Sequence, residues 1–205
     1  MATECCPSSQ NEHQSDQYRR VLWAVLVINA CMFAVELAAG FEARSVSLQA
    51  DALDFLSDTA NYGISLAVVG LTQQLRAKAA LTKGITMGLF GVWVLTAAIW
   101  NLVHQTTPEA TTMGLVGIAA LLSNGIVFAL LWAYRSGDSN MQSVWLCSRN
   151  DVVGNLTVLL AALGVFGTGH GWPDVIVALV MAALALDGAW KVSALAIGEL
   201  RETGA

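Results

Sequence analysis

Residues 45–58 read Ser45-Val-Ser-Leu-Gln-Ala-Asp51-Ala-Leu-Asp54-Phe-Leu-Ser-Asp58, and a mostly apolar run follows to Gly70. This stretch decides the fold, because it places three carboxylates inside a segment that is long and apolar enough to cross a bilayer. An ionised carboxylate in hydrocarbon is costly, so acids at this depth usually face a cavity and have a function there. Asp54 and Asp58 are four residues apart and therefore share one face of a helix.

The composition is that of a membrane protein. The chain has 205 residues, of which 56% are hydrophobic and 12% charged, and its mean hydropathy is +0.59. A soluble domain carries about 25% charged residues. No basic patch with interleaved aromatic residues is present, which argues against nucleic-acid binding. No nucleophile, base and orienting group occur in a plausible set, so the sequence does not predict an enzyme.

Six apolar segments of about 20 residues predict an all-α, polytopic protein with six transmembrane helices. Short breaks with charges or turn residues separate them. Within the segments, Gly84-xxx-Gly88 and Gly114-xx-Gly117 predict close helix contacts. We expect a flexible cytoplasmic tail over residues 1–18, a six-helix transmembrane domain over 19–199 and a short cytoplasmic tail over 200–205. The segments run from Arg20 to Gly40, Val46 to Gly70, Leu81 to Val103, Thr111 to Tyr134, Ser143 to Phe166, and Trp172 to Ile197.

The basic residues predict the orientation. With the N-terminus inside, only Arg44 lies in an outer connection. This asymmetry is the positive-inside pattern. We therefore expect a multi-pass protein of the inner (plasma) membrane with both termini in the cytoplasm. The inner side would hold Arg19, Arg20, Arg76, Lys78, Lys83, Arg135 and Arg201.

Two predicted helices each carry a pair of metal-competent side chains. Asp54 and Asp58 lie on a polar stripe that Asp51 continues toward the outer end of the second segment. In the fifth segment, Cys147 and Asp151 repeat the spacing of four residues. The competing interpretation is a set of interhelical hydrogen bonds and ion pairs, in which Arg149 neutralises Asp151 or one of the other aspartates. We expect Glu36 and Asp187 to be single, solvated acids near helix ends, and Asn29, Asn124 and Asn155 to bond neighbouring helices.

Three carboxylates and a thiolate form a ligand set suited to a divalent transition metal. Four such ligands fit tetrahedral Zn²⁺, and the thiolate favours softer ions such as Cd²⁺. Metal binding requires deprotonated ligands, so protons and metal compete for the same oxygens. That competition is a physical basis for metal/proton antiport. In the N-terminal tail, Cys5, Cys6 and His13 are weaker candidate ligands that could collect metal, although the same residues also suit a plain disordered tail.

These motifs resemble the cation diffusion facilitator family. The stretch from Ser45 to Asp58 is similar to the family's second transmembrane helix, and Cys147-Ser-Arg-Asn-Asp151 is similar to its fifth-helix pair. Trp172-Pro-Asp174 resembles the entry to the sixth helix, and the resemblance covers Arg20 to Ile197. It implies a homodimer that exports divalent metal in exchange for protons by alternating access, with no prosthetic group. The transport site it implies is Asp54, Asp58, Cys147 and Asp151, with Asp51 weaker.

The sequence departs from the family pattern in three ways. Cys147 stands where the first fifth-helix ligand is usually His, which makes Cd²⁺ or Hg²⁺ plausible beside Zn²⁺. The cytoplasmic C-terminal domain of the family is not expected here, so dimerisation would come from the membrane helices. Arg149 places a cation beside the predicted site. The alternative to a transporter is therefore a membrane metal-binding or sensory protein of the same fold that moves nothing, and a further one is a purely structural membrane protein.

Overall fold

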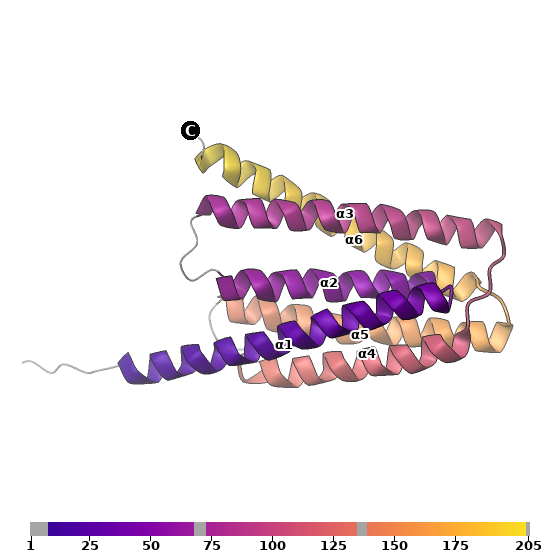
Figure 1. Cartoon of the computed structure of the whole chain (residues 1–205), viewed down its shortest axis with the longest axis horizontal. Helices are drawn as coiled ribbons and strands as arrows, with labels where there is room; N and C mark the ends of the chain where they lie inside the picture. The colour runs from indigo at the N-terminus through magenta and orange to yellow at the C-terminus, as the bar shows by residue number, and fades with distance from the viewer. Residues whose placement is uncertain (1–7, 68–72, 135–138, 204–205) are drawn as a thin grey trace, which may run out of the picture.

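The computed structural model describes the backbone of residues 8–67, 73–134 and 139–203, and the side chains of 16–64, 66, 74–75, 77–134 and 151–201. The described chain is helical and contains six long helices, which confirms the predicted fold class (Figure 1). A short 3₁₀ turn, Trp132–Tyr134, extends the fourth helix. The helices are α1 (Ser8–Glu42), α2 (Val46–Ala67), α3 (Gln73–Val103), α4 (Ala110–Leu131), α5 (Ser139–Thr168) and α6 (Trp172–Thr203).

The helices form two groups. α3 packs mainly on α6, whereas α1 packs on α2 and α4 packs on α5. Figure 1 shows the α3–α6 pair beside a bundle of α1, α2, α4 and α5, with both ends of the chain at the same end of the molecule. The α3–α6 pair diverges from the bundle toward that end (Figure 1).

Five helices are long and apolar enough to cross a membrane: α1, α3, α4, α5 and α6. The remaining helix, α2, has 22 residues, enough to span, and it carries the three aspartates. Large apolar side chains on the outer surface are exposed, for example Phe166 at 79% and Trp190 at 75%. Such a surface suits contact with lipid. The protein is therefore a multi-pass membrane protein.

Several helices extend beyond the predicted segments, and two of them, α1 and α6, extend into the predicted tails. α1 begins at Ser8, inside the segment predicted as a flexible tail, and projects past the other helices of its bundle (Figure 1). α6 ends at Thr203, inside the predicted C-terminal tail.

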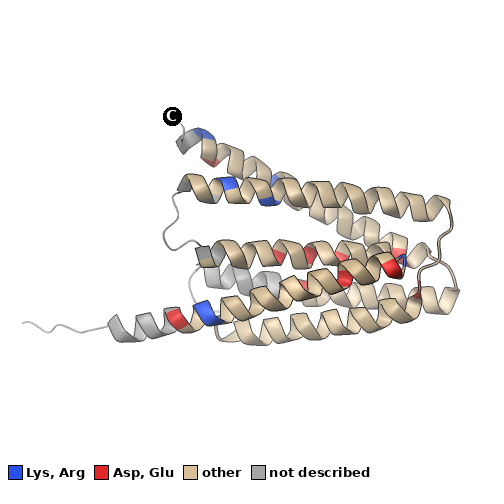
Figure 2. Cartoon of the chain, in the orientation of Figure 1, with Lys and Arg blue, Asp and Glu red and all other residues tan. Residues whose placement is uncertain are grey.

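Basic side chains gather in the half of the molecule that carries the chain ends (Figure 2). Arg44 lies at the opposite end, in the connection between α1 and α2, where its backbone has φ of 55°. Acidic residues follow the helices of the bundle toward that opposite end (Figure 2). The charge distribution is therefore asymmetric along the helix axes, as the sequence predicts.

Glycines bring α3 and α6 into close contact. A Cβ at Gly84 would collide with the hydroxyl of Ser193, and one at Gly88 would lie 3.7 Å from the Cβ of Ala189. The predicted contact at this glycine pair is confirmed. In α4, a Cβ at Gly117 would lie 3.0 Å from Cδ2 of Leu159 in α5, whereas one at Gly114 would meet nothing within 4 Å. Only the second glycine of that pair marks a close contact within the chain.

Asp174 of α6 holds the N-terminus of α2. Its carboxylate accepts hydrogen bonds from the Ser45 hydroxyl at 2.7 Å, from the Val46 amide at 2.9 Å and from the Ser47 amide at 3.0 Å. The first amides of a helix have no partner within the helix, and a carboxylate there is favoured by the helix dipole. Asp174 therefore fixes α2 and α6 against each other at the end that lies opposite the termini.

Replacing Asp174 by Ala is expected to lower the stability of the fold by about 2–3 kcal/mol, because three buried donors lose a charged acceptor. Thermal unfolding of the purified protein in detergent measures the change. Asp187→Ala is the matched control, because Asp187 lies on the same helix but is exposed and pairs with Lys191. Equal midpoints for the two variants would contradict this role of Asp174.

Candidate metal site

Asp58 of α2 and Asp151 of α5 are brought together in the interior. Asp58 is 7% exposed, and its carboxyl group interacts directly with that of Asp151. Tyr62, one turn further along α2, donates a hydrogen bond to Oδ2 of Asp58 at 3.1 Å. Oδ2 of Asp151 is buried and accepts no hydrogen bond. Two carboxyl groups on facing helices, one with a free oxygen, form the core of a cation site.

Asp54 lies beside this pair and faces α5. Its Oδ2 would be 3.8 Å from a Cβ at Gly154, so it lies against the α5 backbone where no side chain intervenes. Asp54 and Asp151 both line a cavity of about 520 Å³, whose other walls come from α3 and α6. These walls are mostly apolar, and they include the thioethers of Met87 and Met181. The carboxylates are thus the charged groups of a largely apolar chamber.

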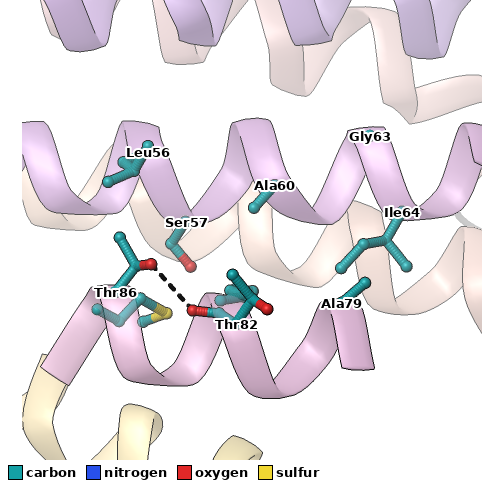
Figure 3. A pocket seen from close by; sticks show the side chains of 10 residues that line it. Leu56, Ser57, Ala60, Gly63, Ile64, Ala79, Thr82 and Thr86 are labelled. Atoms are coloured by element: carbon teal, nitrogen blue, oxygen red, sulfur yellow. Dashed lines mark hydrogen bonds between the residues drawn. The ribbon is translucent and has the colours of Figure 1, made fainter. Parts of the chain in front are cut away.

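A second cavity, of about 490 Å³, lies between α2 and α3. Figure 3 shows its walls, with Ser57, the neighbour of Asp58, pointing from α2 toward α3. Lys83 of α3 also lines it, and its ammonium donates a hydrogen bond to Oδ1 of Asn61. The ammonium group of Lys83 also interacts electrostatically with the carboxylate of Asp58. The charge pattern of the sequence places Lys83 only among the inner basic residues, although a lysine within an apolar segment is itself a signal of a polar interior.

The structure places Asp54, Asp58 and Asp151 near one another. Within the side chains that the structure describes, however, no three His, Cys, Asp or Glu residues form a complete metal-binding group. Cys147 lies on α5, four residues before Asp151, and its side chain is outside the described residues. The side chains of Arg149 and His13 are outside them too, as are Cys5 and Cys6 altogether.

Glu36 is not the solvated acid that the sequence predicted. Its side chain is 0% exposed and it interacts with Asp51 of α2. The prediction is wrong because α1 packs closely on α2 beside Glu36, where Gly40 leaves room for Gln49. Asp187 is exposed and forms an ion pair of 2.6 Å with Lys191, which confirms the prediction for that residue.

Among the described residues, the hydrogen bonds of Asn29 and Asn155 do not reach neighbouring helices, contrary to the prediction. Asn29 donates to the carbonyl of Val25 at 2.7 Å, and Asn155 donates to that of Asp151 at 2.8 Å. Both bonds are within one helix. The side-chain oxygens of Asn29, Asn124 and Asn155 are buried without a hydrogen-bond partner, so the interior offers neutral acceptors as well as carboxylates.

Comparison with known proteins identifies the fold. The family described as the cation efflux transmembrane domain matches residues 22–200. The zinc transporter ZitB of Escherichia coli (strain K12) is 26% identical over 215 residues, which cover 98% of this chain and 68% of the relative. The cadmium, cobalt and zinc/H(+)-K(+) antiporter of Bacillus subtilis (strain 168) is 24% identical over 202 residues, which cover 89% of this chain and 63% of the relative.

A third relative is the metal cation efflux system protein CzcD of Cupriavidus metallidurans, 26% identical over 83% of this chain and 58% of its own length. The chain thus spans about two thirds of the length of these relatives. The relatives are named as transporters, and the resemblance to the cation diffusion facilitators is confirmed. Because the family match extends over nearly the whole sequence, this chain belongs to the family of the cation efflux transmembrane domain.

Proposed function

We propose that this protein exports divalent transition-metal cations of the Zn²⁺/Cd²⁺ class from the cytoplasm in exchange for protons. One observation carries the proposal: Asp58 and Asp151 meet across α2 and α5, and Asp54 and Asp151 line the same cavity. Cys147 would complete the set with a thiolate from α5. Three carboxylates and a thiolate suit four-coordinate Zn²⁺ or Cd²⁺.

The carboxyl groups explain why protons would move in exchange. Adjacent ionised carboxylates in a low-dielectric interior repel each other, so an empty site is more stable when it holds protons. A divalent cation replaces those protons, because its ligands must be deprotonated. Each metal ion that binds therefore releases protons, and each ion that leaves lets protons return.

The two cavities support a route for the ion. The cavity beside Ser57 lies between α2 and α3 (Figure 3), in the part of the molecule where the α3–α6 pair diverges from the bundle toward the chain ends (Figure 1). We propose that this end faces the cytoplasm, with both termini inside, in the inner membrane. The gathering of basic residues there supports this orientation (Figure 2). Movement of the α3–α6 pair against the bundle would then alternate access to the site.

The names of the relatives agree with this assignment. They specify zinc for ZitB, and cadmium, cobalt, zinc, H(+) and K(+) for the Bacillus subtilis antiporter. We further propose that the protein acts as a homodimer, which light scattering in detergent would test. A monomeric mass would contradict the dimer and leave the transport site unaffected.

Metal uptake by proteoliposomes tests the function. Zn²⁺, Cd²⁺, Hg²⁺ and Mn²⁺ are added separately outside vesicles loaded at low pH, and the trapped metal is counted by elemental analysis. Uptake of Zn²⁺ or Cd²⁺ above that of protein-free vesicles is expected. Binding of these ions to the purified protein without uptake by the vesicles would instead favour a metal-binding or sensory protein that moves nothing.

Cys147→His is expected to shift the metal preference from Cd²⁺ toward Zn²⁺, because imidazole is a harder ligand than thiolate. The measured quantity is the ratio of the initial Cd²⁺ and Zn²⁺ uptake rates, which should fall about tenfold or more if the thiolate is a ligand. Cys31→Ser is the control, since Cys31 lies on an exposed face of α1. The same ratio in both variants would remove Cys147 from the ligand set.

A further inference from the structure

Glu36 and Asp51 form a second acidic pair, separate from Asp58 and Asp151. Glu36 is 0% exposed and Asp51 is 1% exposed. Among the charged groups, Asp51 has the strongest electrostatic interaction with Glu36, and Asp54 has the next strongest. This pair joins α1 to α2, whereas the candidate metal site joins α2 to α5. Its carboxyl groups are therefore a different set of ligating atoms in a different helix interface.

Apart from the interaction between the two carboxyl groups themselves, the four buried carboxylate oxygens of this pair have no hydrogen-bond partner among the described residues. The contrast with Asp174 is informative, because that equally buried carboxylate accepts three hydrogen bonds. A buried polar group without a partner is costly, and a buried unpaired charge is more so. Two such groups side by side are stabilised by a shared proton or by a cation between them. Among the described residues, the charges that act on Glu36 are all carboxylates.

The close contact of α1 and α2 covers the pair on one side. A Cβ at Gly40, one turn beyond Glu36, would lie 2.9 Å from Cγ of Gln49, so only glycine allows the helices to approach so closely. Gln49 donates to the carbonyl of Gly40 at 3.3 Å and is 6% exposed. This contact covers the pair toward the end opposite the termini. On its other side the pair continues into Asp54.

Asp54 connects the pair to the candidate metal site. Both Asp51 and Asp58 act on Asp54 through their charges. Along α2, Asp51 lies seven residues from Asp58, which is about 10 Å of helix. From α5, Asn155 adds a buried Oδ1 with no partner, one turn from Asp151. The acids thus form a series from the middle of α2 toward the end opposite the termini, with short steps between neighbours.

We propose that Glu36 and Asp51 form a second, weaker binding subsite for the transported divalent cation, on the exit side of the Asp58–Asp151 site. This inference rests on the proposed export function, which sets the direction of travel. The pair offers oxygens and no thiolate, so it binds Zn²⁺ or Cd²⁺ less tightly than a set that includes Cys147. A weaker site nearer the exit favours release.

Equilibrium dialysis of the full chain in detergent against Cd²⁺ tests the subsite. The wild-type protein is expected to bind one more weakly held ion per chain than Glu36→Gln or Asp51→Asn, while the tight ion is unchanged. Asp58→Asn should lose the tight ion and keep the weak one. Glu42→Gln is the matched control, because Glu42 lies on the same helix and is exposed. Any ion held by Cys5, Cys6 or His13 adds equally to every variant.

The binding counts separate this inference from the export function. If Glu36→Gln and Asp51→Asn bind as many Cd²⁺ ions as the wild type, the subsite is refuted, whatever the vesicles take up. If the counts are as expected but wild-type vesicles accumulate no metal, the two sites exist and export is refuted. If the binding counts are as expected and wild-type vesicles accumulate metal, Glu36→Gln should lower the rate of uptake at saturating Cd²⁺ several-fold. The Cd²⁺ concentration that gives the half-maximal rate should change little. A rate equal to that of Glu42→Gln would show that the subsite is not on the path.

Discussion

Asp58→Asn is expected to reduce metal uptake by at least about 100-fold, because it removes a ligand from the centre of the site. The substitution keeps the volume of the side chain and an oxygen that can accept the Tyr62 hydrogen bond. Loss of transport would therefore reflect lost charge and ligation more than lost packing. The measurement is the initial rate of Zn²⁺ and Cd²⁺ uptake by proteoliposomes that contain equal amounts of folded protein.

Asp187→Asn provides the control for Asp58→Asn. It removes one carboxylate from a helix of the same protein, but at an exposed position where the partner is Lys191. We expect uptake close to that of the wild type, since exposed ion pairs contribute little. Equal uptake by both variants would exclude Asp58 from the transport site.

The affinity of the site for metal is expected to fall steeply as the pH is lowered. For each proton that the metal displaces, the apparent affinity falls about tenfold per pH unit below the range in which the ligands are deprotonated. Displacement of two protons gives about 100-fold per unit. The sign follows from competition: protons occupy the carboxylates at low pH, so metal binds better as the pH rises. Isothermal titration with Cd²⁺ at several pH values measures this slope.

Two variants test whether the pH dependence of metal affinity arises from the carboxylates of the candidate metal site. In Asp151→Asn, one exchangeable proton is removed, so the slope should decrease by about one proton per ion while the remaining affinity is lower at every pH. Glu42→Gln should keep the wild-type slope. An affinity that is independent of pH would mean that metal and protons do not share ligands, which would refute the proposed coupling.

Local spacing predicted much of the candidate site. Asp54 and Asp58 are one turn apart, and that periodicity places them on one face of α2 whatever the helix packs against. The resemblance to a known family paired that face with Asp151 of α5. The first prediction needed only the pattern along a helix, whereas the second needed the family pattern. The structure places the three carboxylates near one another.

Predictions that depended on packing between helices were less secure. Glu36 lies within two turns of the end of α1, and nothing in its local sequence shows that Gly40 lets α2 cover it. The asparagines were also misjudged, because an amide can bond its own helix as readily as a neighbour. The role of Asp174 depends on a contact between segments more than 120 residues apart, with a separation of 128 residues for the Val46 amide. Such contacts follow from the assembled bundle and have no signature in one segment.

The most direct test of the central claim is the pH inside proteoliposomes when metal is added outside. A trapped fluorescent indicator reports the lumenal pH while Zn²⁺ or Cd²⁺ enters. If metal and protons exchange at the carboxylate site, the lumen becomes more alkaline as metal accumulates, and Asp58→Asn abolishes both signals. Accumulation of metal with no change in lumenal pH would contradict exchange for protons.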